Sequence, residues 1–214
     1  MSRSIEVLDR LFQRVVVVSL LAGTSGLVQA QQDDLATEIR ALVDTVETAS
    51  WVQTSWERSG RQEEHTSARC LWAGQDNMRL DVFDGKGKGA TAILFDGRVY
   101  GYKRGLLSFI KRSFELSHKR VRSLRGNQMS QNGFLDDLGF VLDVWDTVIL
   151  EQLTPERTAI SYVDADSLNS TLHLLRNPLR VILHERAEEQ QVVERYHYSE
   201  IDYNLTIDPE LLLP

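Results

Sequence analysis

The sequence is poor in cysteine and in long apolar runs, and each shortage excludes a class of protein. Its 214 residues contain one cysteine. A single cysteine cannot close an internal disulfide, so the chain is not a disulfide-stapled extracellular mini-fold. Cys70 lies in the apolar run Cys70-Leu71-Trp72-Ala73 and is expected to be a small residue of the core. After residue 30, no stretch approaches the roughly 20 apolar residues of a membrane-spanning helix.

Positive charge is also in short supply over the chain as a whole. Lysine and arginine number 24 against 31 aspartate and glutamate residues, giving a net charge of −7. Nonspecific binding of nucleic acid depends on neutralising phosphates, so this balance argues against a nucleic-acid partner. The sequence also lacks a glycine-rich phosphate loop, a nucleophile elbow and a recognisable Ser/His/Asp set. We therefore expect a protein that is not an enzyme, has no catalytic residues and uses no cofactor.

Residues 1–30 have the pattern of a cleavable secretion signal. Three arginines make the first part basic, and the apolar core that follows, residues 15–22, is too short to cross a bilayer of about 30 Å as a helix. Val28 and Ala30 then occupy the −3 and −1 positions of a small-residue cleavage site. We predict cleavage after Ala30 and a soluble periplasmic protein comprising residues 31–214 as one domain. Gln31 follows the predicted cut, so no cysteine is there to carry a lipid.

Two segments of the mature chain have the apolar spacing of amphipathic helices. The first stripe consists of Leu35, Ile39, Leu42, Val43 and Val46. The second helix is expected between residues 130 and 145, where the spaced apolar residues are Leu135, Leu138, Leu142 and Trp145. A helix with such a stripe must pack it against another element, and the second is apolar enough to cover an open sheet or the mouth of a barrel.

Between and after these helices the apolar residues alternate with polar ones, as they do in strands. In Met78-Arg79-Leu80-Asp81-Val82 every second residue is apolar. Asp96-Gly97 separates two strand-like runs and predicts a tight hairpin, because both residues can adopt positive φ. Nine to eleven strands follow one another at hairpin spacing, without βαβ alternation. The pattern predicts a mainly β protein in which one antiparallel sheet curls around an apolar interior.

Three short stretches resemble the periplasmic outer-membrane lipoprotein carrier and lipoprotein-sorting (LolA-like) superfamily. One is the arginine-bearing strand 77–82. Another is the hairpin 93–102, which is similar to the family's pattern of Asp-Gly followed by an aromatic residue and tyrosine. The third is Asn177-Pro178-Leu179-Arg180-Val181 leading to the strand 196–204. The resemblance implies an unclosed β-barrel that is capped by helices and holds acyl chains on its concave apolar face.

From this resemblance we derive a set of candidate ligand-binding residues. The candidates for the apolar cavity are Trp51, Trp56, Leu80, Val82, Leu94, Tyr100, Tyr102, Leu138 and Leu142. The aromatic residues among them also fit ordinary core packing. The candidates for contacts to a polar headgroup are Arg79, Lys111, Arg112, Lys119, Arg120 and Arg122. Arg79 is the best single polar candidate, because it matches the family's arginine-bearing strand.

A cluster of basic residues between positions 103 and 125 stands out against the acidic chain. It consists of Lys103, Arg104, Lys111, Arg112, Lys119, Arg120, Arg122 and Arg125, opposed only by Glu115. Bases gathered on adjacent strands would attract an anionic partner such as a lipid phosphate, lipid A, an acidic glycopolymer or an acidic protein. The alternative is a solvated strand face whose charges prevent edge-to-edge aggregation.

Histidines and paired aspartates have structural explanations that we prefer to catalytic or metal-binding ones. His173, His184 and His197 lie on three neighbouring predicted strands but lack the short ligand spacing of zinc sites, so no metal is expected. Asp136-Asp137 falls at a helix start and Asp164-Ala165-Asp166 in a turn, where capping and turn formation explain carboxylates.

The sequence favours a noncatalytic periplasmic binding or carrier protein for a lipid, a lipoprotein or another amphiphilic envelope component. Its partners would be acyl chains and, transiently, a membrane surface, and the helix 130–145 would move to cover or release the ligand. Two alternatives remain: a regulatory or sensor module of the same fold that contacts an inner-membrane partner protein, and an uncharacterised periplasmic enzyme.

Overall fold

The computed structural model describes residues 32–103, 112–131 and 133–214. The predicted signal segment lies outside the described residues. Within them, no helix is long and apolar enough to cross a membrane.

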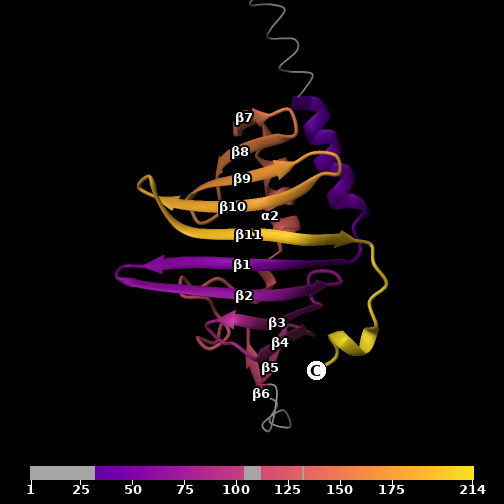
Figure 1. The fold of residues 1–214 in the computed structure, drawn as a ribbon, viewed down its shortest axis with the longest axis vertical. Coiled ribbons are helices and arrows are strands. Elements are labelled where there is room, and N and C mark those ends of the chain that lie inside the picture. The colour runs from indigo at the N-terminus through magenta and orange to yellow at the C-terminus, as the bar shows by residue number, and fades with distance from the viewer. Residues whose placement is uncertain (1–31, 104–111, 132) are drawn as a thin grey trace, which may run out of the picture.

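The core of the molecule is one antiparallel sheet of eleven strands (Figure 1). Their order in the sheet is β6-β5-β4-β3-β2-β1-β11-β10-β9-β8-β7. In chain order the strands are β1 (Ala49–Ser59), β2 (Gln62–Trp72), β3 (Met78–Gly85), β4 (Ala90–Phe95), β5 (Arg98–Lys103), β6 (Arg112–Glu115), β7 (Ile149–Thr154), β8 (Arg157–Val163), β9 (Asn169–Leu175), β10 (Arg180–Glu188) and β11 (Gln191–Tyr203).

The sheet consists of two meanders that meet at a single non-consecutive pair. Strands β1 to β6 form one meander and β7 to β11 the other, and β1 pairs with β11 in the middle of the sheet. That pairing extends from Ala49 opposite Tyr203 to Glu57 opposite Glu194. Because both central strands are long, side chains from the two halves of the chain face each other there.

The two outermost strands, β6 and β7, do not pair with each other, so the sheet remains an unclosed barrel. The predicted fold class, a mainly β protein with an antiparallel sheet and helices, is confirmed. One helix spans residues 32–45 and α2 spans Phe134–Asp143. Figure 1 shows α2 behind the sheet and helix 32–45 along the strand ends beside it. Both predicted helices therefore exist, and α2 is shorter than the predicted range.

One face of the sheet, which we call the inner face, packs against these helices. Phe134 is fully buried at the start of α2 and contacts Trp51, Tyr198 and Tyr203 in edge-to-face geometry, with ring centroids 5.3–6.2 Å apart. Leu138 of α2 is also fully buried. Aromatic pairs of this kind contribute about 0.5–1.5 kcal/mol beyond their buried area. The core therefore fastens α2 to β1 and β11.

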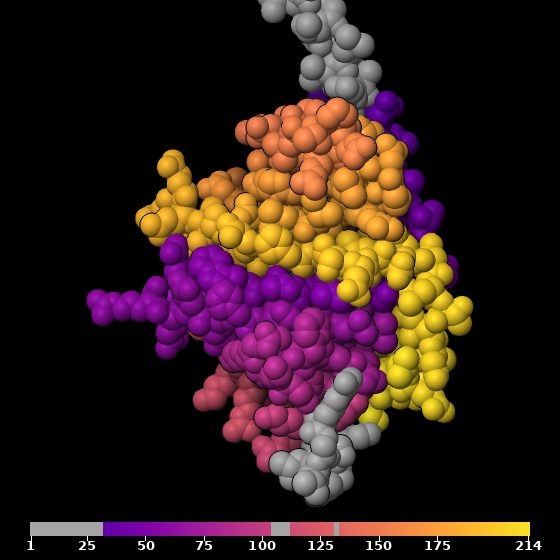
Figure 2. Space-filling model, viewed as in Figure 1, coloured from indigo at the N-terminus to yellow at the C-terminus, as the bar shows by residue number. Residues whose placement is uncertain are grey.

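The other face, which we call the outer face, is covered in part by the C-terminal segment. This segment runs from β11 along the ends of the central strands and ends in a short 3₁₀ helix, η3 (Pro209–Leu212), beside β3 and β4 (Figures 1 and 2). Leu212 is buried, and Asp208 caps η3 by accepting a hydrogen bond from the backbone N–H of Glu210 at 3.0 Å.

Two local predictions are confirmed. Asp96 and Gly97 join β4 to β5 with φ values of 50° and 68°, as the tight hairpin requires. Cys70 is completely buried, and this burial, with a smaller effect of the Asp81 charge, raises the pKa of its thiol well above the usual value. Since the thiolate is the reactive form, Cys70 serves as a packed core residue.

Four of the six tyrosines should resist ionisation while the protein is folded. Burial raises the pKa of Tyr203 to about 12, and it also raises the pKa values of Tyr162, Tyr196 and Tyr198 well above the usual value. A folded pKa above the unfolded value of about 10 means that stability is present below that pH and is lost as pH rises through the folded values. An absorbance titration at alkaline pH should show these four phenols ionising together with the loss of tertiary structure. Gradual ionisation of all six in the folded protein would contradict the burial.

Candidate ligand-binding site

A cavity of about 580 Å³ lies on the inner face over strands β1 to β6. This volume is within the range of roughly 300–1,000 Å³ that small-molecule sites occupy. Strand register explains its apolar floor: Ala68, Val82, Leu80 and Ala92 follow one another across β2, β3 and β4 on the same face. Gly101 continues this row on β5, opposite Ala92. Small side chains in adjacent strands thus leave a hollow above the sheet.

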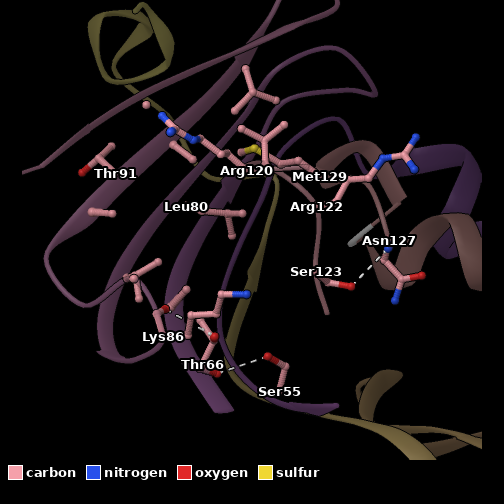
Figure 3. Close-up of a pocket in the computed structure, with 18 of the residues that line it drawn as sticks. Ser55, Thr66, Leu80, Lys86, Thr91, Arg120, Arg122, Ser123, Asn127 and Met129 are labelled. Atoms are coloured by element: carbon pink, nitrogen blue, oxygen red, sulfur yellow. Dashed lines mark hydrogen bonds between the residues drawn. The ribbon is translucent and has the colours of Figure 1, made fainter. Parts of the chain in front are cut away.

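Basic side chains surround this apolar floor. Five of the lining residues carry positive charge, and two carry negative charge. The positive ones are Lys86, Lys103, Arg112, Arg120 and Arg122, and the negative ones are Glu57 and Glu64. Figure 3 shows Arg120, Arg122 and Met129 on one side of the cavity and Lys86 and Thr66 on the other, with Leu80 between them. The cavity is therefore apolar below and net positive at its rim.

Arg122 is the most informative of these cations. Its Nε atom is buried and, among the described residues, has no hydrogen-bond partner. Buried side-chain donors in proteins are nearly always hydrogen-bonded, because an unpaired one keeps the full cost of its desolvation. Lys86, by contrast, pairs with Glu64, with Nζ–Oε distances of 2.5 and 2.6 Å. Arg122 is thus a lining cation with a buried donor that the described residues leave without a partner.

Residues 116–130, which we call the arm, connect β6 to α2 and form one wall of the cavity. The tip of the arm is a turn in which the Gly126 N–H donates to the Ser123 carbonyl and the Asn127 N–H to the Ser123 hydroxyl. Val121 packs against the core from the arm, and Met129 is buried. The position of the arm therefore determines how far the cavity is covered.

Arg125 fastens the tip of the arm to the middle of the sheet. Its backbone N–H donates to Glu57 at 3.1 Å, and its Nε donates to Glu194 at 2.9 Å. Its Nη1 donates to the carbonyl of Arg58 at 3.0 Å, and Nη2 lies 3.4 Å from a carboxylate oxygen of Glu188. The Arg125 side chain is 17% exposed and that of Glu194 is 1% exposed, so this ion pair is shielded from water.

A buried polar network continues from this ion pair. The hydroxyl of Tyr196 lies 3.0 Å from Glu57 Oε1 and 2.9 Å from Glu194 Oε2, while Asn127 Nδ2 donates to both Tyr196 and Glu194. Burial and the charges of Glu194 and Glu57 raise the pKa of Tyr196 well above its usual value, so the phenol keeps its proton. Asn127 and Tyr196 also separate the first cavity from a second one, since they line both.

The second cavity, about 460 Å³, lies on the inner face over the other half of the sheet, near the start of α2. Arg186 of β10 is its main cation, and it donates to Asp164 at 2.7 Å, to Asp166 at 2.5 Å and to Glu194 at 3.1 Å. Burial opposes ionisation of Asp164, but hydrogen bonds from Arg186, Ser170 and the Leu168 N–H lower its pKa. Three carboxylates of the protein therefore neutralise the Arg186 guanidinium.

Six of the predicted ligand-binding residues belong to the lining of the first cavity. They are Leu80, Val82, Tyr102, Arg112, Arg120 and Arg122. Tyr102 lies between Gly101 and Lys103 on β5, so the alternation of the strand turns its side chain to the outer face. There it contributes to the raised pKa of Arg79. Leu80, Val82 and the three arginines are the predicted residues that the structure brings together around one hollow.

The remaining apolar candidates lie elsewhere. Trp51, Leu94 and Leu138 belong to the buried core, and the partly buried Leu142 of α2 packs against it. Trp56 and Tyr100 are on the outer face, because Glu57 and Val99 beside them point inward. There Trp56 donates its indole N–H to Glu63 at 3.3 Å, with the Arg58 guanidinium 5.6 Å from its ring.

Arg79 lies on the outer face and outside both cavities. Its guanidinium forms a bidentate pair with Asp81 at 2.9 and 3.2 Å and donates to the Leu211 carbonyl of η3 at 3.0 Å. Burial alone would lower the pKa of Arg79, but the hydrogen bonds and charge of Asp81, with a smaller effect of Tyr102, raise it. Arg79 thus holds the C-terminal segment against the sheet.

The basic cluster of residues 103–125 is divided by the structure. Lys103, Arg112, Arg120 and Arg122 line the first cavity, while Arg125 is bound in the buried network. Lys119 is exposed on the arm. Arg104 and Lys111 lie outside the described residues. The cluster is therefore neither one patch nor a uniformly solvated face.

The acidic and histidine motifs need one correction. The turn explanation for Asp164 is confirmed, because its Oδ1 accepts hydrogen bonds from the N–H groups of Asp166 and Leu168. The capping explanation for Asp136-Asp137 is wrong: Gly133 caps α2 without a side-chain hydrogen bond. Asp137 instead lies 3.0 Å from Nδ1 of the buried His184.

The three strand histidines do lie on neighbouring strands but on different faces. His173 and His197 are both opposite Leu183, whereas His184 points to the inner face. Among the described residues, no group of three histidine, cysteine, aspartate or glutamate side chains is arranged to hold a metal ion.

The described chain is an unclosed antiparallel half-barrel, with α2 and the arm over its inner face and an apolar hollow beside the arm. No family model matches the sequence, and no curated protein matches it. Among solved structures, an uncharacterized conserved protein from Thermus thermophilus is similar with a TM-score of 0.50 and 14% identity, covering 82% of this chain and 91% of that one.

Two further solved structures have lower similarity scores. A DUF1329 family protein from Desulfovibrio piger has a TM-score of 0.45 and 11% identity, covering 86% of this chain and 96% of that one. A LolA superfamily protein from Nitrosomonas europaea has a TM-score of 0.42 and 9% identity, covering 79% and 91%. The last of these proteins carries the name of the superfamily which three stretches of the sequence resemble.

Proposed function

We propose that this protein is a noncatalytic periplasmic carrier that binds an amphiphile with an anionic headgroup in its first cavity. The observation that carries the proposal is the combination of an apolar floor, made by Leu80, Val82 and Ala92, with a rim that contains Arg120 and the unpartnered Nε of Arg122. An acyl chain would pack on the apolar floor, and a carboxylate or phosphate would bind the arginines of the rim.

Both parts of such a ligand contribute to binding. Each buried CH₂ group contributes about 0.8 kcal/mol by leaving water. Guanidinium groups form charge-assisted hydrogen bonds with carboxylates and phosphates that are about twice as strong as neutral ones. The acyl chain of the ligand supplies affinity, and the rim selects ligands by the charge of their headgroup. Release requires the arm, and not α2 as the sequence suggested, to move, because α2 is fastened to the core by Phe134.

A second candidate function is that of a sensor that contacts a partner protein in the inner membrane. It is favoured by three exposed apolar side chains near the free edge of the sheet: Ile149, Leu153 and Val163, which are 70%, 42% and 57% exposed. Exposed apolar residues at an unpaired strand edge are typical of interaction surfaces. Ligand binding in the first cavity is common to both functions.

Filling the first cavity should abolish binding of an acyl ligand. Ala92 lies in the middle of the floor, between Leu80 and Gly101, so Ala92→Trp would place an indole where the chain lies. We expect at least about a tenfold loss of affinity, or ~1.4 kcal/mol, for dansyl-labelled undecanoate. Fluorescence enhancement measures this affinity directly.

The matched control is Ala41→Trp, which adds the same side chain at an exposed position of helix 32–45. It should bind the probe like the unchanged protein, and circular dichroism should show both variants folded. Equal probe affinity in a folded Ala92→Trp protein, or no binding to the unchanged protein, would contradict the proposed site.

A further inference from the structure

The second cavity differs from the first in the charge of its lining. Five aspartates line it, Asp76, Asp136, Asp137, Asp164 and Asp166, together with Arg186 and His184. Arg186 is held by Asp164, Asp166 and Glu194. Its positive charge is thus already compensated, and the carboxylates at the α2 side leave the cavity negative. Two adjoining hollows on one sheet face therefore have opposite charge.

The lining of the second cavity also contains a buried histidine nitrogen that has no hydrogen-bond partner among the described residues. The His184 side chain is 6% exposed, and its Nδ1 lies 3.0 Å from Asp137 Oδ2. When Nδ1–H is donated to this carboxylate, the neutral ring presents an acceptor at Nε2. This Nε2 atom is buried and has no hydrogen-bond partner among the described residues.

Tyr162, on β8, provides a second such atom in the same lining. The residue is 6% exposed, and its hydroxyl is buried without a hydrogen bond of good geometry within the described chain. Ser170 lies near enough to Tyr162 to lower its pKa, but the Ser170 hydroxyl donates its hydrogen bond to Asp164 at 2.7 Å. Buried polar atoms are normally satisfied, so two unsatisfied atoms in one hollow indicate a missing hydrogen-bonding group.

We propose that the second cavity is a binding site for a primary ammonium group. Such a group has a positive charge, which suits the aspartates, and three N–H donors with no acceptor. His184 Nε2 and the Tyr162 oxygen accept two of these donors, and a carboxylate at the start of α2 accepts the third. The volume of about 460 Å³ leaves room for a short aliphatic amine.

This site is independent of the proposed carrier function, because its ligand has the opposite charge and occupies the other side of Asn127 and Tyr196. A protein with both sites would hold an anionic amphiphile and an amine on the same sheet face. The experiment below separates the two, since filling the first cavity with Ala92→Trp should leave amine binding unchanged.

Isothermal titration calorimetry with n-hexylamine tests the proposal. Hexylamine should bind, and two probes of equal chain length should bind at least about tenfold more weakly. Hexanol lacks the charge, and hexyltrimethylammonium has the charge but no N–H donors. Equal affinity for hexyltrimethylammonium would reduce the site to a nonspecific acidic surface, and no heat with hexylamine would mean that the hollow holds water only. Either result overturns the proposal.

Tyr162→Phe is the decisive variant, because it removes only a hydroxyl for which the described residues offer no hydrogen bond of good geometry, so the fold should stay intact. We expect hexylamine affinity to fall by about ten- to a hundredfold, the loss of one hydrogen bond to a charged group. Tyr100→Phe removes a hydroxyl from the outer face and should change nothing. If Tyr162→Phe binds hexylamine as tightly as Tyr100→Phe does, the tyrosine is not a ligand and the proposal fails.

Discussion

Arg125→Leu should destabilise the protein by about 3–5 kcal/mol, because it removes one of the two cations that neutralise the buried Glu194. Glu194 is 1% exposed and accepts a hydrogen bond from the Arg125 Nε at 2.9 Å. Arg186 would remain beside Glu194, at 3.1 Å, but its other nitrogens bind Asp164 and Asp166. Urea unfolding monitored by tryptophan fluorescence measures the change in free energy of unfolding.

The same variant should loosen the tip of the arm, because the Arg125 side chain binds three groups on β1, β10 and β11 and only the backbone N–H bond to Glu57 would remain. Hydrogen exchange should become faster in the arm while that of β8 and β9 stays slow. The control is Arg69→Leu, which breaks a pair with Glu200 whose side chains are 64% and 69% exposed. Exposed pairs contribute about 0–1 kcal/mol, so this control should be nearly neutral. Equal losses in both variants would contradict the anchoring role of Arg125.

Phe134→Ala should cost about 3–5 kcal/mol, the usual range for removing a large buried aromatic side chain. Phe134 is 0% exposed and contacts Trp51, Tyr198 and Tyr203, so its loss leaves a hole between α2 and the two central strands. The melting temperature and the near-ultraviolet circular dichroism of the aromatic cluster should both fall.

Phe83→Ala serves as its control, because Phe83 is 51% exposed on β3 and its removal opens no cavity. Surface substitutions of this kind change stability by about 0.5 kcal/mol or less. If Phe134→Ala is as mild as Phe83→Ala, then α2 is not fastened to the core, and a moving α2 again becomes a route for ligand release.

The sequence contained most of the fold because the signals for it are local. Asp96-Gly97 defines a hairpin by its own backbone preferences, and the spacing of Leu35 and Ile39 defines a helix face. Alternation also separates the two faces of each strand. It could have shown that Arg79 points away from Leu80 and Val82, and that Tyr100 and Tyr102 point away from Val99 and Gly101. The family resemblance led instead to their inclusion in one site.

The buried network could not be predicted in the same way, because its partners are distant in sequence. Arg125 meets Glu194 only because β1 pairs with β11 and the arm returns across them. The one local signal was the inward series Gln53, Ser55 and Glu57 on β1, polar residues where a closed core would have apolar ones. Polar residues on the buried face of a strand indicate either a buried hydrogen-bond network or a ligand site. Here all three line the first cavity, and Glu57 also belongs to the buried network.

The most direct test of the central claim compares dodecanoate with dodecanol by isothermal titration calorimetry on the unchanged protein. Both have the same chain, so the apolar floor contributes equally, and only the headgroup at Arg120 and Arg122 differs. We predict that dodecanoate binds at least about tenfold more tightly and that raising the salt concentration narrows the difference. Equal affinities, or binding of dodecanol alone, would contradict an anionic amphiphile as the ligand of the first cavity.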